Sequence, residues 1–189
     1  MTYQATETER RFYTNYIQGK PPILERGYGL TYELNQQNLV RLIGSYHLSP
    51  CQNLGKHNCY VTVLDADGNR TREVNLLHGY GSNVYPVILE KPDNEPQGNF
   101  PLYSNVDNYW LKPEGGDKVS GISSRHADEF SGCHEGNTFG HHSFHFVYVV
   151  DEPEPPIEPP TEPIYDQPLW LDDIIVEIDG KRYGLRELN

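Results

Sequence analysis

Residue types that bind metal ions are concentrated between positions 126 and 145. Five of the eight histidines of the chain lie there, with one cysteine and three carboxylates: His126, Asp128, Glu129, Cys133, His134, Glu135, His141, His142 and His145. A zinc ion takes three or four nitrogen, sulfur or oxygen ligands in tetrahedral geometry. The cluster therefore raises the hypothesis of a metal site and of a metal-dependent enzyme.

The spacing of these histidines limits which of them can share one ion. Residues 144–150 are typical of a β-strand because they are aromatic and β-branched. Residues four apart in a strand are separated by roughly 13 Å, so His141 and His145 do not converge, and His142 points to the opposite face. The candidate ligands are then His126, Asp128, His134 and His142. We favour the alternative of ordinary hydrogen bonding and expect no cofactor.

Other catalytic patterns are absent or unspecific. The sequence has no Gly-x-Ser-x-Gly nucleophile motif, no glycine-rich phosphate loop and no His-Glu-x-x-His motif. Glu90, Asp93 and Glu95 could supply paired carboxylates for acid–base catalysis, but any acidic loop contains such pairs. We therefore expect a protein that is not an enzyme.

A polar segment at residues 94–101 could instead present amide and aromatic groups to a sugar. The candidate binding residues are Asn94, Glu95, Asn99, Tyr109 and Trp110. In the alternative interpretation, this segment is a loop whose asparagine side chains bond to its own backbone.

The elements that must position these side chains are short strands. Between residues 36 and 150, apolar and β-branched runs alternate with Gly, Pro, Asn and Asp. The turn-forming residues 65–69 predict a hairpin between the strands on either side, and Pro86 favours an edge strand. The expected strands cover residues 39–48, 59–64, 70–77, 84–89, 106–111, 118–122 and 144–150. The pattern predicts an all-β, antiparallel β-sandwich, Ig-like or jelly-roll, over residues 36–150.

Three further segments are expected outside this domain. Residues 1–35 form an arm that packs on a neighbouring subunit, with a short helix starting near Glu7 and ending before Pro21. Residues 151–163 contain six prolines and five acidic residues, which predicts a semi-rigid extended linker. Residues 164–189 carry Asp-Gly between two strand-like runs, which is typical of a β-hairpin.

The C-terminal hairpin is expected to dock on a partner. A lone two-stranded hairpin is marginally stable in water, and this one carries many apolar side chains. The expected docking residues are Leu169, Trp170, Ile174, Ile175 and Tyr183. Docking on copies of the same chain would make the protein a homo-oligomer.

Composition excludes some classes of partner. The 189 residues carry a net charge of −12, which argues against binding to nucleic acid or to an anionic membrane. No apolar run reaches the roughly 20 residues of a membrane helix, and the polar N-terminus predicts no signal peptide. The three cysteines, an odd number, predict reduced and partly buried thiols, although Cys51 and Cys59 could meet across a loop.

One run, 136–144, ends in His-His-Ser-Phe before an apolar strand. Six further stretches accompany it, at residues 46–50, 53–58, 61–69, 89–99, 117–121 and 125–129. Together they resemble an Ig-like or jelly-roll β-sandwich module that accompanies phage virion proteins and cell-wall lysins. The resemblance covers about residues 39–150 and implies a non-catalytic accessory or structural domain without an assigned ligand. The three cysteines depart from the pattern, and no lysin catalytic domain is present.

These observations predict a structural protein of a phage virion, such as a capsid decoration, head-fibre or tail-associated component. It would anchor by one end, display the β-sandwich, and contact capsid or tail proteins and copies of itself. A carbohydrate- or cell-surface-binding module is the first alternative function. A metal-dependent enzyme that uses the histidine cluster is the second.

Overall fold

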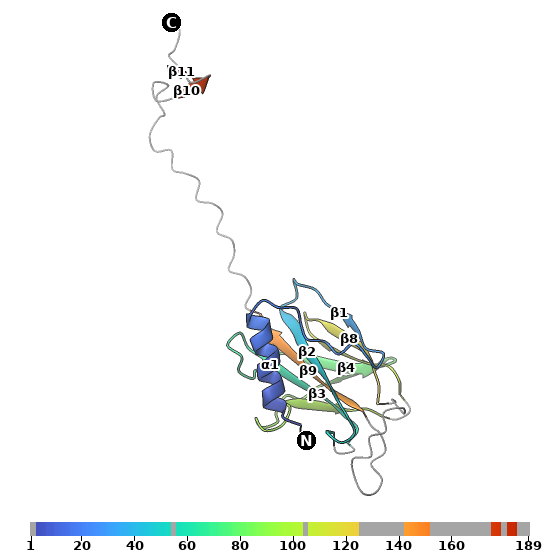
Figure 1. Ribbon diagram of the computed structural model, residues 1–189. Helices are drawn as coiled ribbons and strands as arrows, with labels where there is room; N and C mark the ends of the chain where they lie inside the picture. The colour runs from blue at the N-terminus through green and yellow to red at the C-terminus, as the bar shows by residue number, and fades with distance from the viewer. Residues whose placement is uncertain are drawn as a thin grey trace. The chain divides into compact units, whose positions relative to one another are not determined.

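The computed structural model describes residues 3–53, 56–103, 106–124, 142–151, 175–178 and 181–184, the last two ranges by backbone alone. The chain divides into two compact units, Met1–Pro153 and Glu154–Asn189. The described part of the first unit is mostly β, with two sheets and one helix (Figure 1).

Helix α1 spans Ala5–Ile17 and precedes all the strands. One sheet has four strands in the order β2-β9-β3-β6, and the other has five in the order β1-β8-β7-β4-β5. The strands are β1 Thr31–Glu33, β2 Val40–Leu48, β3 Asn58–Leu64, β4 Leu76–Tyr80, β5 Asn83–Pro86, β6 Gly98–Pro101, β7 Tyr109–Pro113, β8 Lys118–Ile122 and β9 Ser143–Val150.

Strand β9 is buried on both of its faces. Phe144, Phe146 and Tyr148 belong to a core that both sheets share. Val147 and Val149, on the opposite face of the strand, pack in a second core beneath α1. The helix therefore covers the outer face of the four-stranded sheet, and the five-stranded sheet covers its inner face (Figure 1).

Helix α1 is held against the sheet by an apolar stripe. Ala5 and Phe12 are buried on one face of the helix, and Phe12 is completely enclosed. Its ring lies directly over Gly44, next to an irregularity in the pairing of β2 with β9. A Cβ atom at position 44 would collide with this ring, so the close approach of the helix requires glycine there.

Most of the expected strands are present with shifted ends. The strand over 118–122 has the expected bounds, and β5 lies at a sheet edge as Pro86 predicts. The expected hairpin between 59–64 and 70–77 is wrong. β9 occupies one edge of β3 and β6 occupies the other from Asn58 to Val61, so the returning chain pairs only with the end of β3, at the Leu64–Arg70 bridge, and then enters the other sheet as β4.

The pairing is not wholly antiparallel. Strand β9 runs parallel to β3 and antiparallel to β2, whereas the other pairs of described strands are antiparallel. A parallel pair needs a long connection, and here it is the whole segment between Leu64 and Ser143. Turn patterns in the sequence cannot predict pairing between two strands that are so distant along the chain.

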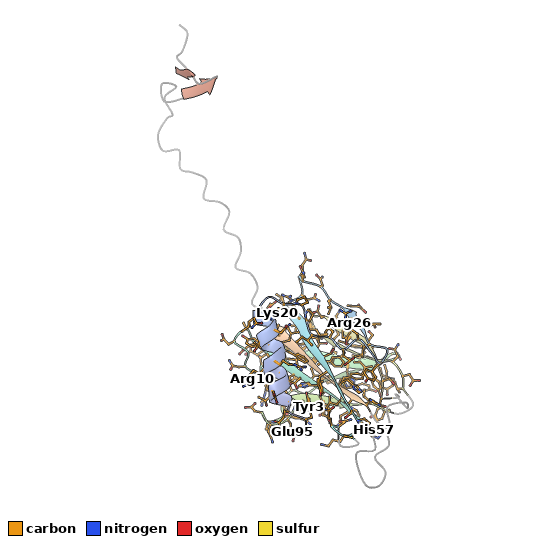
Figure 2. All side chains as sticks on the ribbon, viewed as in Figure 1. Tyr3, Arg10, Lys20, Arg26, His57 and Glu95 are labelled. Carbon is orange, nitrogen blue, oxygen red and sulfur yellow. The ribbon has the colours of Figure 1, made fainter. Side chains whose placement is uncertain are left out.

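The first 35 residues contact their own domain extensively. Besides α1, they supply β1, which pairs with β8, and Ile23, which bridges to Gly44 at the free edge of β2. Figure 2 shows Tyr3 near the N-terminal end of α1 and Lys20 beyond its other end. Segment 1–35, expected as an arm for a neighbouring subunit, thus contributes a helix and a strand to this unit.

The second unit contains strands β10, Ile175–Ile178, and β11, Lys181–Gly184. They pair antiparallel with Ile178 opposite Lys181, as the Asp-Gly turn predicts. The expected linker at 151–163 lies outside the described residues except for Asp151.

The packing of Phe12 generates a test of the role of α1. Phe12→Ala should lower the free energy of unfolding by about 3–5 kcal/mol because it empties an enclosed site. Ile17→Ala on the same helix removes an exposed side chain, 61% accessible, and should change stability by less than about 0.5 kcal/mol. Urea unfolding followed by circular dichroism measures both. Equal effects of the two substitutions would contradict the packing.

Candidate functional site

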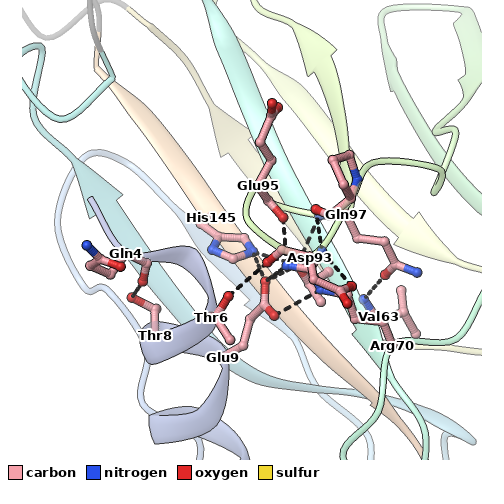
Figure 3. A network of polar contacts seen from close by, with 12 residues as sticks. Gln4, Thr6, Thr8, Glu9, Val63, Arg70, Asp93, Glu95, Gln97 and His145 are labelled. Atoms are coloured by element: carbon pink, nitrogen blue, oxygen red, sulfur yellow. Dashed lines mark hydrogen bonds and ion pairs between the residues drawn. The ribbon is translucent and has the colours of Figure 1, made fainter. Parts of the chain in front are cut away.

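A network of polar side chains lies between α1 and the four-stranded sheet (Figure 3). Glu9 of α1 is only 5% exposed, and glutamate is rarely buried without a partner. Arg70, in the segment after β3, donates from Nη2 to Glu9 Oε1 at 2.8 Å and from Nε to Oε2 at 3.1 Å. This bidentate contact is a strong form of charge-assisted hydrogen bond.

A chain of hydrogen bonds continues from Glu9 across the sheet. Thr62 Oγ1 on β3 donates to Glu9 Oε1 at 2.7 Å and lies 2.9 Å from His145 Nε2 on β9. Because the threonine proton goes to Glu9, His145 Nε2 must carry the ring proton and donate to Thr62. Nδ1 of His145 then accepts a hydrogen bond from the Tyr3 hydroxyl. The donors are therefore ordered from Tyr3 through His145 and Thr62 to Glu9.

Burial keeps Tyr3 and His145 of this hydrogen-bonded chain uncharged at neutral pH. It lowers the pKa of His145 to about 3, with a smaller contribution from the positive charge of Arg70. Burial also raises the pKa of the Tyr3 hydroxyl. The neutral imidazole and the protonated phenol are the forms that the observed hydrogen bonds require.

The same network fastens two loops to β3. Arg70 donates to the carbonyl oxygens of Pro92 at 3.0 Å and Glu95 at 2.6 Å. Gln97 accepts from the backbone N–H of Val63 at 2.9 Å, and its side-chain amide donates to the carbonyl of Thr71 at 2.6 Å. These donors and acceptors are bonded to other groups of the protein, so the network stabilises the fold.

A second buried carboxylate, Asp117, organises the turn before β2. It is 3% exposed and accepts hydrogen bonds from the backbone N–H groups of Asn35 and Leu42 and from the Asn38 amide, at 2.7–2.9 Å. A cavity of about 270 Å³ lies beside it, lined in part by Tyr16 and Arg41. Both of these side chains also bind Asp151, directly after β9, with Arg41 Nη1 2.9 Å from Asp151 Oδ2.

The predicted metal ligands are only partly described. His126, Asp128 and His134 lie outside the described residues. His142 is completely buried, and its Nδ1 lies 2.6 Å from Nε2 of His47. The two imidazole rings stack with a centroid separation of 4.8 Å. Within the part of the chain that the structure describes, no three His, Cys, Asp or Glu side chains are placed to hold one ion.

The predicted sugar-binding residues are not brought together. Tyr109 is completely buried in the shared core, and its hydroxyl accepts from the backbone N–H of Tyr103. Asn94 is exposed, Glu95 forms an ion pair with Lys91 at 3.4 Å, and Asn99 pairs with Tyr60 within the four-stranded sheet. Trp110 lines a groove on the five-stranded sheet.

The predicted docking residues belong to the second unit. Ile175 lies in β10 opposite Gly184, and Tyr183 lies in β11 opposite Val176. Leu169, Trp170 and Ile174 lie outside the described residues.

The cysteines differ from the expectation of three reduced thiols. Cys51 is disulfide-bonded, whereas Cys59 is a free and completely buried thiol in the shared core. The Cys51–Cys59 pair is therefore not formed, because the side chain of Cys59 points into the core from β3. Burial also raises the pKa of the Cys59 thiol, which keeps it protonated.

Sequence reasoning missed the residues that matter most to the buried network. Ala5, Glu9 and Phe12 follow the spacing of one helical face, so an acid lies in the middle of an apolar stripe. That pattern signals a buried carboxylate in need of a cation. Nothing local identifies Arg70 as that cation, because it lies far along the chain beyond β3.

Comparisons with protein-family models, with curated proteins and with solved structures found no match to this chain. Among the described residues, no helix has the length and apolar character needed to cross a membrane.

The Glu9–Arg70 pair can be tested by removing one partner. Arg70→Met should lower the free energy of unfolding by about 3–5 kcal/mol because it leaves Glu9 buried without its cation. The double variant Glu9→Leu/Arg70→Met should be less destabilised than the sum of the two single variants. The exposed pair Lys118–Glu33, with a 2.7 Å separation, supplies the control: Glu33→Gln should cost less than about 1 kcal/mol. Additive effects would contradict the coupling.

The buried imidazole predicts how stability depends on pH. The pKa of His145 is about 3 in the folded protein, below the ordinary 6.5, so the unfolded chain takes up the proton first as pH falls. The contribution of the neutral imidazole to the free energy of unfolding is therefore fully present above about pH 6.5 and is lost towards pH 3. About 2 kcal/mol of it is lost between pH 7 and pH 5. Urea midpoints should fall less steeply with pH in His145→Gln. An unchanged slope would contradict the neutral imidazole.

Proposed function

We propose that the protein is a non-enzymatic structural component of a phage virion. In this proposal the first unit, Met1–Pro153, here called the β-domain, is displayed, and the C-terminal hairpin attaches it to capsid or tail proteins. The observation that carries the proposal is the division of the chain into two compact units, the second of which contains a two-stranded sheet. The two-stranded sheet described in this unit would be marginally stable alone, so in this proposal it packs on a partner surface.

The composition of the chain at the boundary of the two units supports a tethering role. Residues 151–163 are rich in proline and acidic side chains, a composition that keeps a chain extended. Such a spacer separates the attached end from the displayed end. The sequence resemblance of residues 39–150 to a module of phage virion proteins and cell-wall lysins supports the assignment to a phage virion.

The β-domain fits a display role through its internal bonding. The charged and polar groups beneath α1 contact one another, the backbone of the loop before β6 and the backbone of the segment after β3, and this arrangement suits a rigid scaffold. We propose that its two sheets form a sandwich of Ig-like or jelly-roll type with α1 added on one face. Copies of the chain would associate through the hairpin unit.

The proposal predicts that the protein is part of purified particles. Particles formed without the protein should lack density that wild-type particles show by negative-stain electron microscopy. A chain without residues 164–189 should fold with an unchanged Tm for the β-domain. When it is added to particles that lack the protein, it should not sediment with them, whereas the full chain should.

The matched control is the full chain carrying Ile17→Ala, which changes an exposed residue of the β-domain. This variant should sediment with the particles as the wild type does. Particles that are identical with and without the protein, or attachment that survives removal of the hairpin, would overturn the proposal.

A further inference from the structure

A groove lies on the five-stranded sheet, lined by Trp110 and Leu77 from the face opposite Tyr109 and by Leu76 and Val87 of the shared core. Its volume is about 580 Å³, within the range of small-molecule sites. Strands β4, β5 and β7 and the segments that flank them form its walls. The side chains that shape its floor and one side are Asn75, Leu77, Ile88, Trp110, Lys112 and Glu114.

The floor of the groove contains an indole ring that lies on bare backbone. Trp110 of β7 pairs with Gly79 of β4. A Cβ atom at Gly79 would lie 2.7 Å from Cζ2 and 2.8 Å from Cε2 of Trp110, so no side chain separates the ring from the strand. The ring is partly exposed, in contrast to its completely buried neighbours Tyr109 and Leu111. One part of the indole therefore packs on the sheet while another meets solvent.

Aliphatic side chains extend this apolar floor. Leu77 is 37% exposed and Ile88 is 57% exposed. Such clustering of exposed apolar side chains marks binding surfaces in proteins.

Polar groups stand at one side of the floor. The Asn75 amide donates to Glu114 Oε2 at 2.9 Å, and both residues line the groove with Lys112. The amide and ammonium supply hydrogen-bond donors, and the carboxylate supplies acceptors. The charges of Lys112 and Glu114 cancel, so the lining has no excess of either sign.

We infer that this groove binds a neutral carbohydrate, with the apolar face of a sugar ring on Trp110 and its hydroxyl groups bonded to Asn75, Lys112 and Glu114. A polyhydroxylated ring needs an apolar surface beside both donors and acceptors, which is the combination present here. A phosphate or sulfate polymer needs several cations, and the groove offers one beside an anion. This inference concerns a different surface from the C-terminal hairpin and does not depend on the virion proposal.

The experiment titrates the full-length protein with neutral oligosaccharides. The probes are maltohexaose, cellohexaose and the hexamer of N-acetylglucosamine, each followed by isothermal titration calorimetry and tryptophan fluorescence. The chain has two tryptophans, at positions 110 and 170. A Trp170→Phe background therefore makes the fluorescence change report on Trp110.

At least one probe should bind and should quench or shift the fluorescence of Trp110. Trp110→Ala should weaken that binding roughly 30-fold, as expected when an aromatic anchor is removed. Glu114→Gln should weaken it less, because the amide retains one acceptor oxygen. Tyr103→Ala, which removes an exposed aromatic ring that does not line the groove, is the matched control and should bind like the wild type.

Circular dichroism and Tm measurements establish that each variant is folded. Failure of all three neutral probes at millimolar concentration would overturn the inference, as would binding that Trp110→Ala leaves intact. Preferential binding of a heparin hexasaccharide would assign the groove to an anionic ligand instead. A dimer that dissociates in Trp110→Ala, measured by light scattering, would assign it to a second copy of the chain.

Discussion

The ion pair between Glu9 and Arg70 is the contact on which the arrangement of the β-domain depends. It joins α1 to the segment after β3, and the remaining guanidinium hydrogen bonds hold the loop that precedes β6. Removing two charges from water has a large unfavourable free energy, which a bidentate contact and added hydrogen bonds offset. The pair is therefore sensitive to the position of every element around it. A shift of α1 would separate the charges and leave them buried.

Local patterns in the sequence predicted the strands better than their partners. The aromatic and β-branched run at 144–150 predicted strand β9. The proline at position 86 predicted the edge strand β5. The hairpin expected around the 65–69 turn is limited to the bridge between Leu64 and Arg70, because β6 occupies the rest of that edge of β3 and β9 the other edge. The turn itself is present, with Asp65 accepting from the backbone of Asp67 and Asn69. Turn chemistry fixes a local bend, whereas pairing is decided by distant strands.

The candidate sites show the same division between local and distant information. Trp110 is predicted as a binding residue together with the polar segment at 94–101 and Tyr109, and in the structure it lines a groove. Tyr109, its neighbour, was grouped with it but points into the core, since consecutive strand residues face opposite sides. Glu9 and Asp117 were not recognised. Their cations and donors come from segments that only the folded chain brings near.

The central place of β9 determines the order in which the domain can form. β9 is the last strand of the β-domain along the chain, yet it separates β2 from β3 and supplies side chains to both cores. During synthesis the chain must therefore complete residue 150 before its first two long strands belong to one sheet. Until then β2 and β3 expose hydrogen-bonding edges and apolar faces of the kind that promote aggregation. Closure of this sheet is a late, non-local event, which predicts slow folding with a high contact order.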